Sequence, residues 1–292
     1  MYYLLSLFIG ILISLMVAFN GGLAKLAGVY SASVIIHVLS LVFVSAWILL
    51  KRDRPFNKAH PWFFYLGGIL GVVPTILNGF AFGRISIPAI LALGLFGQSV
   101  LGLFIDKFGL MGMPKYPFRK RKLIGLAFVF CGIVSMVGRF DAAVMPLSFF
   151  AGVSVAMARP LNARLAKATN IRVSTFYSCL IGLAASVAVF FVLGRSEAFL
   201  AFDIAPNWYV FIGGILGAFV IALSNKIVFK VPALYLSLFL FLGQVFSGIL
   251  IDTVISRYFS VQNLIGGIFV AIGLIVNLLF DKSPRLPASA KA

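Results

Sequence analysis

Two glutamines and two aspartates recur at the same spacing within hydrophobic stretches of the chain. The stretch GQSVLGLFID contains Gln98 and Asp106, and the stretch GQVFSGILID contains Gln244 and Asp252. An amide or a carboxylate in hydrocarbon is costly unless it contacts protein or water, so each must face a protein interior or a wet cavity. Side chains of these types bind polar solutes through hydrogen bonds, and the acids can form ion pairs.

The composition indicates the medium in which these residues lie. The chain has 292 residues, of which 62% are hydrophobic and 11% charged, and this excludes a soluble globular domain. Segments of about 20 apolar residues are long enough to cross a bilayer as helices. We predict an all-α integral membrane protein with ten transmembrane helices, at residues 2–24, 32–50, 62–82, 85–105, 122–140, 144–166, 172–194, 207–229, 232–252 and 263–280.

The net charge of +17 is distributed unevenly across these spans. If successive connections alternate between the two sides, 19 of the 24 Lys and Arg residues fall on the side that holds both termini, and five on the other. Positive residues are retained in the cytoplasm, so we expect both termini there, in a multi-pass membrane protein. The basic residues then meet anionic lipid headgroups, and no nucleic acid is expected as a partner.

The chain is an internal repeat. NGGLAK, which begins at Asn20, matches NARLAK, which begins at Asn162; WFFYLGGILG matches WYVFIGGILG; and Arg84 aligns with Lys230. Each repeat holds five predicted spans, an odd number, so the second copy must enter the membrane from the opposite side. We therefore predict two inverted five-helix repeats, residues 1–141 and 142–292, within one transmembrane domain.

The order of these motifs resembles that of a known family. An N-x-x-L-A helix, a Trp-led G-G-x-x-G helix, G-Q leading to I-D, the segment KFGLMGMP and a further glycine-containing helix follow one another as in the YdcZ-type, EamA-like branch of the drug/metabolite transporter (DMT) superfamily. The resemblance covers nearly the whole chain. It implies a ten-helix secondary transporter that exports a small molecule, and it supplies no substrate.

The four amides are the candidate substrate-binding residues. Gln98 lies eight residues from Asp106, about 12 Å along a helix, and a half-membrane is about 15 Å, so Gln98 falls near the midplane. Gln244 has the same depth from the opposite side, so both could reach a central cavity. The alternative is that each amide, like Asn20 and Asn162, only joins helices through hydrogen bonds or close packing.

Other residues have mainly structural interpretations. We expect His37 to be structural and Arg159 to snorkel to the inner interface, with anion binding as its alternative. The two GGILG segments contain glycines spaced four residues apart, which let helices approach closely: Gly67, Gly71, Gly213 and Gly217.

Several chemistries are not expected. None of the seven acidic residues falls at mid-membrane, which disfavours a strongly cationic substrate and favours a small neutral or zwitterionic metabolite, although cation–π contacts leave a quaternary ammonium open. Two histidines and two cysteines, Cys131 and Cys179, are scattered through the chain, so we expect no metal, disulfide, cofactor or catalytic group. The expected assembly is a monomer or weak dimer.

A second class of function competes with transport. The basic stretch 107–121 could hold a phosphate headgroup, as in an intramembrane lipid-handling protein or enzyme. An enzyme would not require an inverted repeat, and the stretch lacks a catalytic pair, so transport is the favoured interpretation and the protein is not expected to be an enzyme.

The two aspartates lie at predicted helix C-termini, where the helix dipole disfavours an acid. On the predicted topology each has basic residues on its own side. We expect two ionic gates, an inner one of Asp106 with Lys230 or Lys167 and an outer one of Asp252 with Arg84 or Lys25. The alternative is that all six are interfacial anchors that pair with water.

The topology can be checked with reporters. A reporter fused after Ala292 and one inserted near Lys115 should both be cytoplasmic, and one inserted near Ser196 should be external. A cytoplasmic signal near Ser196 would contradict the inversion.

Overall fold

The structure is a computed structural model that describes residues 2–55, 60–108, 122–137, 143–195, 197, 205–228, 230 and 233–280. Within these ranges the chain forms ten α-helices and no β-strand, and each predicted span overlaps one of these α-helices. The helices are α1 (Tyr2–Ala27), α2 (Val29–Lys51), α3 (Leu66–Ala81), α4 (Ile87–Phe108), α5 (Lys122–Met136), α6 (Met145–Ala168), α7 (Ile171–Leu193), α8 (Ile212–Ile227), α9 (Ala233–Ser256) and α10 (Val261–Phe280).

Among the described residues, seven helical segments are long and apolar enough to cross a membrane: α1, α2, α4, α7, α9, and α3 and α8 together with the turns that precede them. The helix α6 is long enough but carries the basic residues Arg159, Arg164 and Lys167. The apolar stretches of α5 and α10 are shorter, Leu123–Met136 and Val261–Asn277. Two of the predicted spans are not continuous α-helices. They begin as 3₁₀ turns, η1 (Trp62–Tyr65) before α3 and η3 (Ala205–Phe211) before α8.

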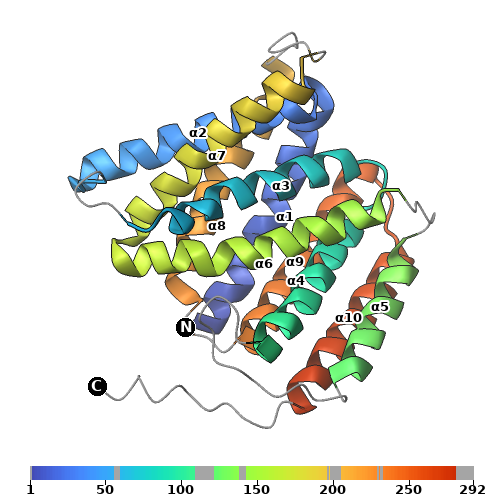
Figure 1. Ribbon diagram of the computed structural model, residues 1–292. Helices are drawn as coiled ribbons and strands as arrows, with labels where there is room; N and C mark the ends of the chain where they lie inside the picture. The colour runs from blue at the N-terminus through green and yellow to red at the C-terminus, as the bar shows by residue number, and fades with distance from the viewer. Residues whose placement is uncertain are drawn as a thin grey trace.

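The two halves of the chain are interleaved (Figure 1). The first helix of each half packs on the third and fourth helices of the other half, so α1 contacts α8 and α9, and α6 contacts α3 and α4. The helix α2 lies beside α7, and α5 lies beside α10 at one edge of the bundle. The largest buried apolar cluster is formed mainly by α1, α4 and α9 and the neighbouring faces of α5 and α10.

Glycines lie at close contacts between the two halves. A Cβ on Gly67 of α3 would collide with the amide of Asn162 on α6, and a Cβ on Gly213 of α8 would collide with the amide of Asn20 on α1. The glycines that follow them, Gly68 and Gly214, pack closely against backbone carbonyls of α7 and α2 respectively. The motif shared by the two halves therefore reflects one contact made twice, in which an asparagine amide packs against a glycine of the opposite half.

The last glycines of the two GGILG motifs, Gly71 and Gly217, do not pack as expected. A Cβ on Gly71 would meet no atom within 4 Å, and one on Gly217 would meet only ordinary contacts, with Met16 Sδ at 3.6 Å and Ser40 Oγ at 3.8 Å. Both glycines instead line a cavity. The four-residue glycine spacing was thus wrongly interpreted as a single packing motif, because its two positions face different surroundings.

Carboxylates fix both ends of the α2 and α7 pair. The helix α2 starts after Gly28, which offers no side-chain cap, and Glu197 from beyond α7 accepts hydrogen bonds from the backbone N–H groups of Tyr30 (3.3 Å) and Ser31 (2.8 Å). At the opposite ends, Asp53 pairs with Arg172 in the first turn of α7 and accepts a hydrogen bond from Asn170 Nδ2 at 3.2 Å. A carboxylate at a helix N-terminus satisfies free N–H groups and opposes the helix dipole favourably.

The Asp53 contact predicts a pH-dependent stability. The hydrogen bond from Arg172 holds the pKa of Asp53 below its ordinary value, so its contribution is present above the unfolded pKa of about 4 and is lost as pH falls through the lower folded pKa. Asp53→Asn should lower the thermal midpoint of the detergent-solubilised protein at pH 7 by about 2–4 °C, the effect of about 1 kcal/mol. The difference between variant and wild type should shrink below about pH 4.

Arg172→Met serves as the matched control for this pair. The double variant should lose less than the sum of the two single variants, since the contact is shared. Strict additivity of the two losses would show that Asp53 and Arg172 act independently.

Candidate functional site

A cavity of about 210 Å³ lies between the two halves of the chain. Eight helices line it, α1 to α4 from the first half and α6 to α9 from the second. Among the described residues, α5 and α10 contribute no lining side chain. The volume is below the 300–1,000 Å³ of typical drug-sized pockets, so the cavity suits a small solute.

All four predicted amides line this one cavity: Gln98, Gln244, Asn20 and Asn162. Gln244 is 2% exposed and Asn162 is 7% exposed, so both lie deep in the protein. Asn162 Oδ1 accepts a hydrogen bond from Ser178 Oγ at 2.7 Å, which joins α6 to α7. Asn20 Oδ1 is buried and has no hydrogen-bond partner. The two equivalent asparagines therefore pack alike but differ in hydrogen bonding.

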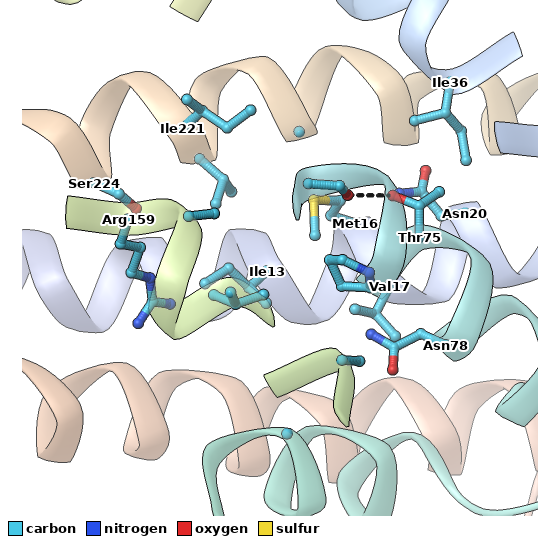
Figure 2. Close-up of a pocket in the computed structure, with 18 of the residues that line it drawn as sticks. Ile13, Met16, Val17, Asn20, Ile36, Thr75, Asn78, Arg159, Ile221 and Ser224 are labelled. Carbon is cyan, nitrogen blue, oxygen red and sulfur yellow. Dashed lines mark hydrogen bonds between the residues drawn. The ribbon is translucent and has the colours of Figure 1, made fainter. Parts of the chain in front are cut away.

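Arg159 turns into the cavity, which corrects the expectation that it snorkels. It lies nine residues before the end of α6, about 14 Å along the helix axis, and its Nη1 donates to Gln98 Oε1 at 2.6 Å. Figure 2 shows its guanidinium extending toward the same space as Ile13 of α1. Gln98 therefore does join helices, α4 to α6, and it also orients the guanidinium.

Asn78 of α3 is a lining residue that the sequence reasoning missed. Its Oδ1 is buried without a hydrogen-bond partner, and Figure 2 shows Asn78 beside Val17. The hydroxyl of Thr75, on the same helix, donates to the Gly71 carbonyl at 3.2 Å. The available signal was an asparagine in an apolar span seven residues after Gly71, where the second repeat has Ser224 seven residues after Gly217.

His37 forms hydrogen bonds within α2 and with α7, as expected of a residue that joins helices. Its Nδ1 lies 2.8 Å from the Ser33 carbonyl, one turn earlier on α2, and 3.1 Å from Ser186 Oγ on α7. Cys179 and Cys131 are free thiols, and the described residues contain no group of three or more His, Cys, Asp or Glu side chains that could hold a metal ion.

The described lining of the cavity has one fixed positive charge and no negative one. Among the described residues that line it, Arg159 is the only Lys or Arg, and none is Asp, Glu, Phe, Tyr or Trp. Both common means of holding an organic cation, a carboxylate and an aromatic face, are thus missing from this part of the chain. The lining can offer hydrogen-bond donors, amide oxygens and apolar surface.

The predicted outer-gate residues do not pair with one another in this conformation. The backbone N–H of Ile87, the first residue of α4, donates to the Asp252 carboxylate, so this acid lies at a helix N-terminus. Lys25 Nζ lies 5.2 Å from the centre of the Phe82 ring, and Arg84 is exposed. Within the described part of the chain no ion pair joins Asp252 to either base.

Of the inner-gate residues, Lys230 is placed most clearly. Its Nζ donates to the Tyr2 hydroxyl at 3.1 Å. Lys167 is exposed near the end of α6, and the side chain of Asp106 lies outside the described residues. Residues 109–121, most of the basic stretch behind the lipid-handling alternative, also lie outside them.

A bundle of long apolar helices around a small polar cavity is typical of membrane transporters. The chain matches the model of a family described as "Putative inner membrane exporter, YdcZ" over residues 1–135 and 143–276. The protein therefore belongs to this family of the drug/metabolite transporters, a family of multi-pass inner-membrane transport proteins. The match falls into two successive segments, one in each half.

Solved structures share the fold. Among 27 matching chains, one described only as "Crystal structure of protein" has a TM-score of 0.61 at 16% sequence identity and covers 96% of each chain. At this identity the likeness concerns the fold alone. No curated protein matches the chain.

The gate hypothesis predicts opposite effects of the two aspartates. Asp252→Asn should shift the protein toward an outward-open form and Asp106→Asn toward an inward-open form, because each substitution weakens closure on one side. Both acids are tested with cysteines at Thr75 and Ser224, two small cavity residues, in a Cys131→Ser/Cys179→Ser background. Modification of these cysteines by a membrane-impermeant reagent should change in opposite directions in the two variants.

If labelling at both positions stays as in the parent protein, the acids are anchors and not gates.

Proposed function

We propose that the protein is a secondary transporter that exports a small neutral or zwitterionic metabolite across the bacterial inner membrane. In this proposal ten helices cross the membrane as two inverted repeats, both termini are cytoplasmic, and the cavity opens alternately to the two sides. Gln98, Gln244, Asn20 and Asn162 bind the solute.

The single observation that carries the proposal is that one cavity is lined by matching helices of both halves. In inverted-repeat transporters the solute site lies at the interface of the repeats, and transport follows when one repeat moves against the other. The asparagine and glycine contacts, made once by α1 with α8 and once by α6 with α3, give this interface two equivalent crossings. Either crossing can loosen while the other keeps the halves together.

The central amides give the test of transport. Gln98→Leu and Gln244→Leu remove hydrogen-bonding groups at similar volume, and each should lower solute flux in proteoliposomes about tenfold or more, the effect of losing one or two buried hydrogen bonds. The solute is first found with a metabolite library, by its thermal stabilisation of the detergent-solubilised protein. Flux is then measured at equal amounts of reconstituted protein.

Gln262→Leu is the matched control, because Gln262 is exposed at the start of α10 and does not line the cavity. It should transport normally. Normal flux in both cavity variants would refute the role of the central amides, and aggregation of the variants alone would indicate that the amides only join helices.

A further inference from the structure

We propose that α2 and α7, one helix from each half, stay joined throughout transport and form a fixed axis about which the other cavity-lining helices move. This inference rests on the proposed transport function and names the part of the protein that keeps its contacts in both the inward-open and the outward-open form.

Hydrogen bonds join the two helices at both of their ends. At one end Glu197, which follows α7, accepts a hydrogen bond from the backbone N–H of Ser31 in the first turn of α2 at 2.8 Å. At the other end Asp53, which follows α2, accepts hydrogen bonds from Arg172 Nη2 at 3.0 Å and from Asn170 Nδ2 at 3.2 Å, at the start of α7. Each end therefore has the same arrangement, an acid that follows one helix and binds the N-terminus of the other.

Polar contacts also join the middle of the pair, which Figure 1 shows side by side. Ser33 Oγ of α2 lies 2.9 Å from Ser186 Oγ of α7, and this hydroxyl also lies 3.1 Å from His37 Nδ1. A Cβ on Gly182 of α7 would collide with the His37 ring, so the two helices touch closely here. Ser33, Ser186 and His37 are buried, and separating the helices would leave these groups without one another as partners, which is costly.

The two end contacts are equivalent in the repeat. Asp53 follows α2 as Glu197 follows α7, and α2 and α7 are the second helices of the two halves. When inverted repeats alternate between inward-open and outward-open forms, the two halves exchange their arrangements. That exchange converts the Glu197 contact into the Asp53 contact, and both contacts are already present in one conformation. A gate would be closed on one side and open on the other, so these contacts belong to the part that does not change.

The helices α4 and α9, which also belong to different halves, meet in another way. A Cβ on Gly248 of α9 would lie 3.1 Å from Leu91 Cδ1 and 3.6 Å from Ile87 Cγ2 of α4, so this contact is apolar. The Asp252 carboxylate adds one hydrogen bond, from the Ile87 N–H. Apolar helix faces can part into lipid at little cost, since lipid tails are as apolar as the side chains they replace. Movement is therefore easier between α4 and α9 than between α2 and α7.

A disulfide tests whether α2 and α7 separate during the cycle. Ser33→Cys/Ser186→Cys replaces two hydroxyls that lie 2.9 Å apart, and oxidation in membrane vesicles joins the two sulfurs. The same protein carries Thr75→Cys as a reporter in the cavity, in a Cys131→Ser/Cys179→Ser background. A negatively charged, membrane-impermeant methanethiosulfonate is added to right-side-out and to inside-out vesicles, and mass spectrometry measures the modification of the reporter peptide.

With the disulfide formed, the reporter should be modified from both sides at rates within about twofold of those of the same protein after reduction, because both open forms remain accessible. The comparison disulfide is Ile87→Cys/Gly248→Cys, which joins α4 to α9 at the end that is external in the proposed topology. It should lower modification from the outside about tenfold or more, because the outward-open form is no longer populated, and leave modification from the inside unchanged.

Spin-label distances give a second measurement without any buried substitution. Labels at Ala46 on α2 and Ala188 on α7, both exposed, should give one narrow distance in lipid nanodiscs. Labels at Phe150 on α6 and Leu250 on α9, two exposed positions on other cavity-lining helices, should give a broad or two-peaked distribution. This comparison decides the matter if the disulfide variant does not fold.

Two results would overturn the proposal: the α2–α7 disulfide abolishes modification from one side, or the α2–α7 distance is as broadly distributed as the α6–α9 distance. The reduced protein separates this proposal from the function on which it rests. A reporter that is modified from only one side in the reduced protein would refute alternating access and the axis together. Modification from both sides before oxidation and from one side after it would refute the axis alone.

Discussion

The placement of negative charge is the constraint on which the rest of the structure depends. A carboxylate near hydrocarbon is stable only where N–H groups or a cation receive it. Glu197, Asp53 and Asp252, the acids whose side chains the structure describes in contact, each lie at the N-terminal turn of a helix, respectively α2, α7 and α4. These acids lie at the ends of helices and do not line the cavity between the halves, and among the described residues that line it Arg159 is the only Lys or Arg.

The contacts between halves explain how a repeat can build an unequal site. Asn20 and Asn162 each sit on a glycine of the other half, so the frame of the cavity is made twice with the same parts. Its chemistry is not made twice, since Arg159 occupies in the second half the position that Val17 holds in the first. A symmetric frame therefore carries an asymmetric lining, with a guanidinium in the second half where the first half has an apolar side chain.

The sequence predicted the helices and the four amides of the cavity but not the direction of several polar side chains. Apolar runs must be helical in a bilayer, so their position follows from composition, and an amide in such a run must face the interior. Whether Arg159 extends inward or to the interface depends on a partner from a distant helix, Gln98, and no spacing along the chain shows that pair. The same holds for Asp252, whose partner is a backbone N–H group of α4 and not the bases on its side.

The helices α3 and α8 both begin with a 3₁₀ turn immediately before the glycines that touch the opposite half. In a 3₁₀ turn the backbone N–H bonds to the carbonyl three residues earlier, and in an α-helix to the one four residues earlier, so a residue at the junction can exchange one acceptor for another. A bilayer offers no water to a released peptide group. Such an exchange lets the helix bend or lengthen while every peptide group keeps a hydrogen-bond partner. The protein has this junction of 3₁₀ and α-helix at the matching point of each half.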